Sequence, residues 1–488
     1  MVCGTSSDAG KTHFVTGLCR LLARRGVRVA PFKAQNMSLN SFVTAAGDEI
    51  GRAEGVQALA AGAEPEVAMN PILMKPTGDR HAQIVVLGRP VGHLSAVEYH
   101  ERKPALKQTV VECLNDLRAR FDVVVAEGAG SPAEINLMDG DIVNLPIAAE
   151  ARLPAIVIGD IDRGGVFASL YGTVTLLPDR YRRLVQGFVI NKFRGDPALL
   201  GSGLTDLEQL CGVPTLGVLP WVEDLHLDAE DSLALAHRRG FAAEPALADP
   251  LDIAVVALPY LSNFTDFDPL SIEPGVSVRF VGDRGALGMP DLVVLPGSKS
   301  TVADLEWLRA TGLAGAVGLL ASAGTPVLGI CAGYQMLGRT ITDDVEGCRG
   351  RVDGLGWLPV DTLFTVEKTV RQRRGRSLGQ ELTGYEIHHG QVRAERGWID
   401  LDPSGTDGCA VEDPAWMLGT NLHGLFEQDA FREGFLMALA ERRGKRFAPA
   451  GVSFAEARTS QFDRLADLLD HHIDLEALEQ IITRGRLS

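Results

Sequence analysis

The sequence contains no long apolar run, no recognisable leader and no block of basic residues. No stretch approaches the roughly 18 consecutive apolar residues that a membrane-spanning helix requires. The first residues show no basic segment followed by an apolar one, so no secretory signal is recognisable. From these absences we predict that the chain is not a membrane protein and that it is cytoplasmic.

Seven cysteines are scattered along the 488 residues, and no two of them form a Cys-x-x-Cys pair. An odd number without regular spacing argues against a disulfide framework, and the missing pairs argue against a zinc site built from thiolates. Both observations are consistent with a reducing compartment.

The formal net charge is −16, and the chain has no long run of lysine or arginine. A general nucleic-acid binder needs a basic surface that displaces counterions from phosphates, so this charge disfavours a nucleic-acid partner. A small anionic ligand remains compatible with it, because a helix N-terminus and a few local basic side chains act at short range.

The length of the chain predicts two or three domains. Short apolar strands alternate with helical stretches, which is typical of a parallel sheet covered by helices on both faces. The pattern restarts after a segment rich in Ala, Pro and charge. We therefore predict an α/β fold with two doubly wound domains, over 1–227 and 252–440, joined by a linker over 228–251. The tail, 441–488, is predicted to be helical and to pack through its apolar face.

A glycine-rich segment follows the first strand and reads GTSSDAGKT over residues 4–12. Glycines let such a loop turn its N–H groups toward phosphate, and the following helix N-terminus adds positive potential. The lysine can reach the outer phosphates, and the threonine can offer a hydroxyl to Mg²⁺. The residues predicted to bind ATP here are Gly4, Thr5, Ser6, Ser7, Gly10, Lys11 and Thr12. The first strand has so few residues that either it is very short or the true start of the protein lies upstream.

Polar residues also follow three further strands, at the edge where open α/β sheets bind their ligands. Glu127 ends one strand and is predicted to hold Mg²⁺ directly or through water. Asn191 ends another and is predicted to contact the nucleotide. A polar loop follows the strand over 155–159. Its charged residues, which we expect to meet the substrate, are Asp160, Asp162 and Arg163.

Several segments of the N-terminal half resemble a known family. GTSSDAGKT, PFKAQNMSLNS, EGAG and the strand-end asparagine resemble the dethiobiotin-synthetase-like amide ligases. More narrowly, KAQNMSLNS, EIGRAEGVQA, MNPILMKPTGD and GDIDRGGVFASLYGT are similar to the cobyric acid synthase family. The resemblance implies ATP, Mg²⁺ and a carboxylate that is phosphorylated before ammonia attacks it. It also implies that Lys33 helps to hold the phosphoryl group. Glu49 is a further candidate ligand of the metal or the substrate. The spacing alone favours the neighbouring Asp48 equally.

The C-terminal half contains a predicted nucleophile, Cys331, at the centre of a Gly-x-Cys-x-Gly motif. The motif follows an apolar strand over 327–330, and its glycines permit the sharp strand-to-helix turn that exposes a central side chain. The helix N-terminus behind the sulfur favours the reactive thiolate. A cysteine nucleophile requires a base, and the strongest candidate is His423, with His388 and His389 as competitors.

A second strand-to-turn segment, LPGSKST, carries Gly297, whose backbone N–H is predicted to form an oxyanion hole with that of Ala332. Together with GICAGYQMLG, GYEIHHG and GTNLHG, this segment resembles the class I glutamine amidotransferase domains of the cobyric acid synthase family. The resemblance implies a flavodoxin-like domain and glutamine as nitrogen donor. Many relatives carry a glutamate two residues after the base, to orient it. That position is Leu425 here, and Glu427 lies two further on, so the third catalytic member stays open.

These segments together predict a carbon–nitrogen ligase that uses ATP and glutamine. The resemblance implies amidation of the b, d, e and g carboxylates of adenosylated cobyrinic acid a,c-diamide, a corrinoid, in cobalamin biosynthesis. Rival interpretations are the related a,c-diamide synthase, CTP synthase, and a P-loop ATPase switch without ligase activity. An ATPase switch would not need a nucleophilic cysteine on a sharp turn together with a histidine base, so Cys331 and His423 argue against it. The sequence predicts no tightly bound prosthetic group and leaves the oligomeric state open.

Overall fold

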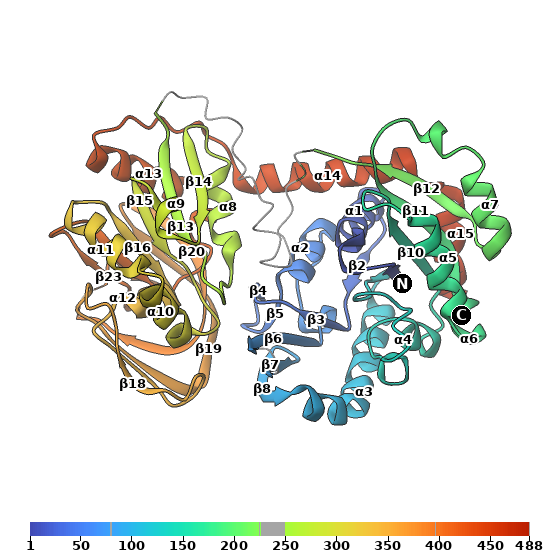
Figure 1. Ribbon diagram of the computed structural model, residues 1–488, viewed down its shortest axis with the longest axis horizontal. Helices are drawn as coiled ribbons and strands as arrows, with labels where there is room; N and C mark the ends of the chain where they lie inside the picture. The colour runs from blue at the N-terminus through green and yellow to red at the C-terminus, as the bar shows by residue number, and fades with distance from the viewer. Residues whose placement is uncertain (79–80, 224, 226–248, 396, 488) are drawn as a thin grey trace.

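The computed structural model describes residues 1–78, 81–223, 225, 249–395 and 397–487. Two α/β bodies lie side by side, and the long helix α14 extends from one to the other (Figure 1). The predicted α/β class with two doubly wound domains is confirmed. Most of the predicted linker, residues 228–248, lies outside the described residues.

The main sheet of the N-terminal body is parallel. Its strands run in the order β1-β10-β11-β12, and the pair β2-β9 joins its edge through a bridge between Val2 and Glu127. A smaller sheet, β3-β6-β7-β8, and the hairpin β4-β5 lie toward the C-terminal body (Figure 1). The strands are β1 (Val2–Gly4), β2 (Val29–Phe32), β3 (Gln35–Met37), β4 (Ser41–Val43), β5 (Glu49–Gly51), β6 (Ile72–Gly78), β7 (His81–Val86), β8 (Arg89–Ser95), β9 (Val123–Ala126), β10 (Ala155–Asp160), β11 (Val185–Phe193) and β12 (Thr215–Pro220). The helices are η1 (Ser7–Ala9), α1 (Lys11–Arg24), α2 (Arg52–Ala61), η2 (Val67–Met69), α3 (Ala96–Arg120), η3 (Met138–Gly140), α4 (Leu145–Glu150), α5 (Val166–Leu176), α6 (Asp179–Arg182), η4 (Pro197–Leu200) and α7 (Gly203–Cys211).

The C-terminal body contains a sheet in the order β14-β13-β15-β16-β24-β23, parallel except for its last strand. A second, mixed sheet is dominated by the long antiparallel pair β19 and β20. The strands are β13 (Leu251–Val256), β14 (Val276–Val281), β15 (Leu292–Leu295), β16 (Val327–Ile330), β17 (Thr340–Asp343), β18 (Gly350–Asp353), β19 (Asp361–Ser377), β20 (Gln380–Arg393), β21 (Ile399–Leu401), β22 (Thr406–Asp407), β23 (Cys409–Val411) and β24 (Met417–Thr420). The helices are η6 (Phe264–Phe267), α8 (Asp268–Ser271), α9 (Arg284–Leu287), α10 (Thr301–Ala310), α11 (Leu313–Ser322), α12 (Ala332–Leu337), η7 (Leu425–Glu427), α13 (Asp429–Arg443), α14 (Phe454–His472) and α15 (Leu475–Leu487).

The C-terminal tail returns to the N-terminal body. Helix α14 buries Phe462, Leu465 and Leu469 and packs along α1, where a Cβ added at Gly17 would lie 3.0 Å from the carbonyl oxygen of Leu465. Arg20 pairs with Asp463 at 2.8 Å along the same contact. The tail, which follows the C-terminal body in the chain, therefore packs its apolar face on the N-terminal body and connects the two.

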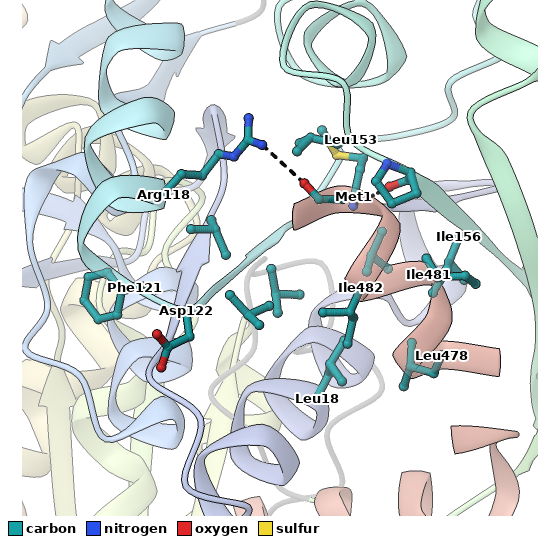
Figure 2. Close-up of a pocket in the computed structure, with 16 residues that line it drawn as sticks. Met1, Leu18, Arg118, Phe121, Asp122, Leu153, Ile156, Leu478, Ile481 and Ile482 are labelled. Carbon is teal, nitrogen blue, oxygen red and sulfur yellow. Dashed lines mark hydrogen bonds between the residues drawn. The ribbon is translucent and has the colours of Figure 1, made fainter. Parts of the chain in front are cut away.

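A pocket of about 210 Å³ lies between the start of the main sheet and helix α15. Met1, Ile156 and Ile481 line it, and Arg118 closes one side by donating to the carbonyl oxygen of Gly485 at 3.3 Å (Figure 2). It sits at the amino ends of the strands, opposite the edge at which parallel sheets bind ligands. Within the described residues, no helix has the length and apolar character needed to cross a bilayer.

Candidate active sites

The glycine-rich loop runs from the end of β1 into α1, with Gly10 at a φ of 98°. A Cβ at Gly10 would lie 2.0 Å from Asn191 Nδ2, so the close approach of these two residues requires glycine. Asn191 Nδ2 donates to the carbonyl oxygen of Ala9 at 2.9 Å and thereby supports the loop. Lys11 Nζ lies over the same loop and donates to the carbonyl oxygen of Ser6 at 2.8 Å. The segment thus has the strand–loop–helix geometry of a phosphate site.

Glu127 is the centre of a buried polar cluster beyond the ends of β2 and β9. Its Oε1 accepts from Thr12 Oγ1 at 2.9 Å and from Lys33 Nζ at 3.1 Å. Its Oε2 accepts from Gln57 Nε2 at 2.7 Å. Three residues from separate segments therefore converge on one carboxylate, and the adjacent hydroxyl and carboxylate oxygens are ligand types that fit Mg²⁺.

Glu54 and Gln57 extend this cluster and were missed by the sequence interpretation. Glu54 accepts from Asn36 Nδ2 at 2.9 Å and lies 3.8 Å from Lys33 Nζ. The sequence spacing could have identified them as a pair, because Glu54 and Gln57 are three positions apart on α2 and therefore lie on one face of the helix. Only the fold shows that this face is turned toward Glu127.

Glu49 lies apart from the Thr12–Glu127 cluster. It is completely buried and pairs with Lys75 at 2.8 Å and Lys368 at 2.5 Å. Its rival Asp48 pairs instead with the exposed Arg89 at 2.9 Å. The structure thus separates Glu49 from the other two predicted metal ligands.

The charged residues at the end of β10 lie near the glycine-rich loop: Asp160 is buried at the end of the strand, and Asp162 and Arg163 are exposed in the loop that follows. Asp160 pairs with Lys192 at 2.8 Å, and Arg163 pairs with Asp8 at 2.9 Å. Asp162 pairs with Arg194 at 2.7 Å. These charges adjoin the glycine-rich loop through Asp8 and, within the described part of the chain, form no hydrogen bond with Glu127.

Cys331 stands at the turn between β16 and α12, with φ 52° and ψ −109°. The two neighbouring glycines of the motif make this strained turn sterically feasible. A Cβ at Gly333 would lie 1.8 Å from the carbonyl oxygen of Leu295, and one at Gly329 would lie 2.7 Å from the backbone nitrogen of Tyr334. The local sequence therefore dictates the elbow.

His423 contacts Cys331 and is oriented by Asp266. Its Nδ1 lies 2.7 Å from Asp266 Oδ2, and the backbone N–H of Gly424 donates to the other carboxylate oxygen at 2.9 Å. Tyr385 stacks on the imidazole, with ring centroids 5.4 Å apart. Burial lowers the pKa of His423, but the charges of Asp266 and Cys331 outweigh it and raise the pKa to about 10. The geometry is that of a nucleophile, a base and an orienting carboxylate.

Asp266 was not singled out from the sequence, because it precedes His423 by 157 positions and lies in η6. Glu427 turns away and pairs with Arg52 at 2.8 Å and Arg458 at 3.2 Å. The competing histidines His388 and His389 line the same cavity as Cys331.

Replacement of Asp266 by asparagine is expected to lower kcat/KM for glutamine hydrolysis by about 10²–10⁴-fold, because a neutral amide cannot stabilise the imidazolium. Since Asp266 raises the pKa of His423, the alkaline limb of the pH–rate profile should move to lower pH. Glutamate release measured from neutral to alkaline pH checks this expectation. Glu427→Gln is the matched control and should leave the alkaline limb in place; an unmoved limb in Asp266→Asn would contradict the role of Asp266.

Ala332 and a pair of opposite charges also line the cavity around Cys331, and Gly297 lies beside it. A Cβ at Gly297 would lie 2.9 Å from His423 Cε1, so the predicted oxyanion loop reaches the base. Asp304 holds this loop by accepting from Ser298 Oγ at 2.5 Å, and burial raises the pKa of Asp304 to about 7. Lys299 and Glu346 pair with each other in the cavity wall.

Comparison with known proteins places both bodies in described families. The CobQ/CobB/MinD/ParA nucleotide binding domain matches residues 1–234, and the CobB/CobQ-like glutamine amidotransferase domain matches residues 252–431. A cobyric acid synthase of Streptomyces avermitilis is 53% identical over 492 residues, covering 99% of this chain and 96% of the relative. One of Saccharopolyspora erythraea is 54% identical over 494 residues, covering 99% and 94%. The chain therefore belongs to the cobyric acid synthase family of ligases, which join a nucleotide-binding domain to a glutamine amidotransferase domain.

Proposed function

We propose that this chain uses glutamine and ATP to amidate the b, d, e and g carboxylates of adenosylated cobyrinic acid a,c-diamide. The observation that carries the proposal is that one chain holds two catalytic arrays, Cys331–His423–Asp266 and Lys11–Thr12–Glu127. The first array suits hydrolysis of an amide, and the second suits phosphoryl transfer. The identity of relatives along the whole chain supports the corrinoid acceptor.

In the glutaminase, Cys331 Sγ attacks the carbonyl carbon of the glutamine side chain. The backbone N–H groups of Gly297 and Ala332 stabilise the negative oxygen of the tetrahedral intermediate. His423 protonates the leaving nitrogen, ammonia departs, and water then resolves the thioester to glutamate. Lys299 and Glu346 offer the two charges that the α-carboxylate and α-ammonium groups of glutamine require.

In the nucleotide-binding body, the acceptor carboxylate takes the γ-phosphoryl group of ATP and becomes an acyl phosphate. Lys11 and Lys33 stabilise negative charge on the transferred group, while Asn191 supports the loop that cradles the phosphates. Thr12 and Glu127 would hold Mg²⁺, which would neutralise negative charge on the phosphates. Glu49, Asp160, Asp162 and Arg163 were predicted as metal or substrate ligands. Of these, the buried Asp160 and the exposed Asp162 and Arg163 lie beside the glycine-rich loop. Ammonia attacks the acyl carbon, and phosphate leaves.

Mass spectrometry of corrinoid acceptors tests the proposed function. Adenosylated cobyrinic acid a,c-diamide incubated with the chain, ATP, Mg²⁺ and glutamine should gain amides until four have been added. Cobyrinic acid without the a and c amides serves as the second acceptor. Amidation restricted to that earlier corrinoid would favour the a,c-diamide synthase, and ATP hydrolysis without any amide would favour a switch.

A further inference from the structure

A cleft of about 730 Å³ lies between the two bodies and, among the described residues, shares no lining residue with the cysteine cavity. Phe42 of β4 and Arg52 of α2 line it from the N-terminal body, on the side that faces the other body (Figure 1). Arg374 of β19, Tyr385 of β20 and Arg458 of α14 line it from the C-terminal part of the chain. Small-molecule sites commonly measure roughly 300–1,000 Å³ and favour domain boundaries. The cleft therefore has the size and the position of a ligand site.

The cleft concentrates positive charge in an acidic chain. Within the described part of the chain, its charged lining consists of four arginines and two carboxylates, namely Arg52, Arg373, Arg374, Arg458, Asp402 and Glu427. Positive charges are thus in excess here, whereas the whole chain carries a net charge of −16. Charges act mainly within the Debye length of about 8 Å at physiological ionic strength, so distant acidic residues do not cancel this local excess. The cleft is suited to an anionic ligand.

Two neighbouring arginines of β19 can bind carboxylates of such a ligand. Arg374 is exposed, and its side chain forms no ion pair with any described residue. Arg373 donates from Nε to Glu386 at 2.7 Å, a carboxylate that it shares with Arg371. A guanidinium carries five N–H donors in a planar fork, so Arg373 and Arg374 can each bind a further carboxylate through hydrogen bonds.

The cleft already holds one carboxylate between two arginines. Glu427 pairs through one oxygen with Arg52 at 2.8 Å and through the other with Arg458 at 3.2 Å. Arg52 begins α2 and Arg458 lies on α14, so the two guanidinium groups come from separate elements. This arrangement shows that the spacing of the arginines fits a carboxylate, which is the group that a ligand would bring.

Apolar side chains form the remaining walls and indicate the kind of molecule that fits between the arginines. Phe42, Leu59, Tyr385 and Pro403 line the cleft. A ligand with carboxylates alone would leave these groups in contact with water, whereas a ligand with an apolar body would cover them. A corrinoid acid has both features, because its macrocycle is largely apolar and its carboxylates lie on side chains around the rim.

We propose that this cleft binds the polycarboxylate corrinoid acceptor through carboxylates that are not reacting. The inference rests on the proposed function, which supplies the corrinoid. One helix connects the cleft with the phosphoryl-transfer centre: Arg52 begins α2, and Gln57, about 7.5 Å further along the helix axis, donates to Glu127. The cleft is therefore a substrate site built by both bodies, distinct from the glycine-rich loop.

The positive charge also distinguishes the acceptor from its product. Each amidation replaces a carboxylate with a neutral amide and removes one negative charge from the corrinoid. Because the attraction to the arginines increases with the charge of the ligand, affinity for the cleft should fall as amides are added. A corrinoid that still carries several carboxylates is retained, and the amidated product is released.

Equilibrium dialysis of the full chain with adenosylated cobyrinic acid a,c-diamide tests the assignment. Arg374→Met should raise the Kd of this acceptor about fivefold or more, because the variant removes one charged hydrogen-bond donor. Arg458→Met, on another element, should raise it similarly and covers the case in which the first variant fails to fold. The corrinoid already amidated at b, d, e and g should bind the original chain more weakly, and its Kd should change less in both variants.

Arg376→Met is the matched control. Arg376 lies on the same strand as Arg374, pairs with Glu381 at 2.9 Å and does not line the cleft, so its loss should leave the Kd unchanged. An unchanged Kd in both cleft variants would overturn the proposal, and so would an equal rise in Arg376→Met, which would indicate a general effect of net charge. A matching rise in the Kd of ATP would assign the arginines to nucleotide phosphates instead.

The proposed function is judged separately, by amide formation in the original chain. Amides formed by a chain whose acceptor Kd does not depend on Arg374 or Arg458 would refute the site and leave the function standing. Cleft-dependent binding of the acceptor without any amide formed from glutamine or ammonium would refute the function and leave the site standing.

Discussion

Replacement of Cys331 by alanine is expected to abolish glutamine-driven amidation, with a loss of about 10⁴-fold or more. The reason is that Cys331 provides the sulfur of the thioester intermediate. No other cysteine of the described residues lines its cavity. Amide formation and glutamate release, each measured with glutamine as sole nitrogen source, should both disappear.

Added ammonium should restore amidation in the Cys331→Ala variant. Ammonium supplies the nitrogen without the glutaminase, and the cluster around Glu127 is formed by the other body. Cys113→Ala, on helix α3, is the matched control and should retain both activities. A variant that ammonium cannot rescue would show that Cys331 serves both centres, which contradicts the proposed division of labour.

Local sequence was sufficient to place the elbow and the phosphate loop. The strained φ of Cys331 depends on two glycines within two positions of it, and the approach of Asn191 depends on Gly10. Apolar strands such as β15 and β16 were likewise visible, because strands buried on both faces are apolar throughout. Such features are encoded by neighbours along the chain, so a single sequence reveals them.

Long-range packing determined what the sequence did not reveal. Asp266 reaches His423 across 157 positions, and Lys368 reaches Glu49 across 319. No motif marks either carboxylate as a partner, because the contact exists only after η6 or β19 has been positioned by the fold. The long pair β19–β20 was also missed, since stretches such as Arg371–Arg376 are polar and carry no apolar alternation.

Replacement of Glu127 by glutamine should stop amidation from both nitrogen sources. The expected loss is about 10²–10³-fold, because the variant removes the charge that would hold Mg²⁺ and balance Lys33 at the phosphoryl group. The glutamine side chain has nearly the same shape as that of glutamate, so its amide oxygen can still accept from Thr12 and Lys33. Gln57 Oε1 has no partner in the described structure, so a flip of the Gln57 amide lets it accept from the new amide nitrogen.

The measurement is amide formation with glutamine and, separately, with ammonium, over a series of Mg²⁺ concentrations. Loss of a charged ligand should raise the Mg²⁺ requirement by about tenfold or more. The glutaminase does not contain Glu127, so glutamate release should persist, uncoupled from amidation. Glu112→Gln, on the exposed face of α3, is the control and should match the original chain. Retention of ammonium-driven amidation in Glu127→Gln would remove Glu127 from the phosphoryl-transfer centre, because amidation from either nitrogen source requires phosphoryl transfer.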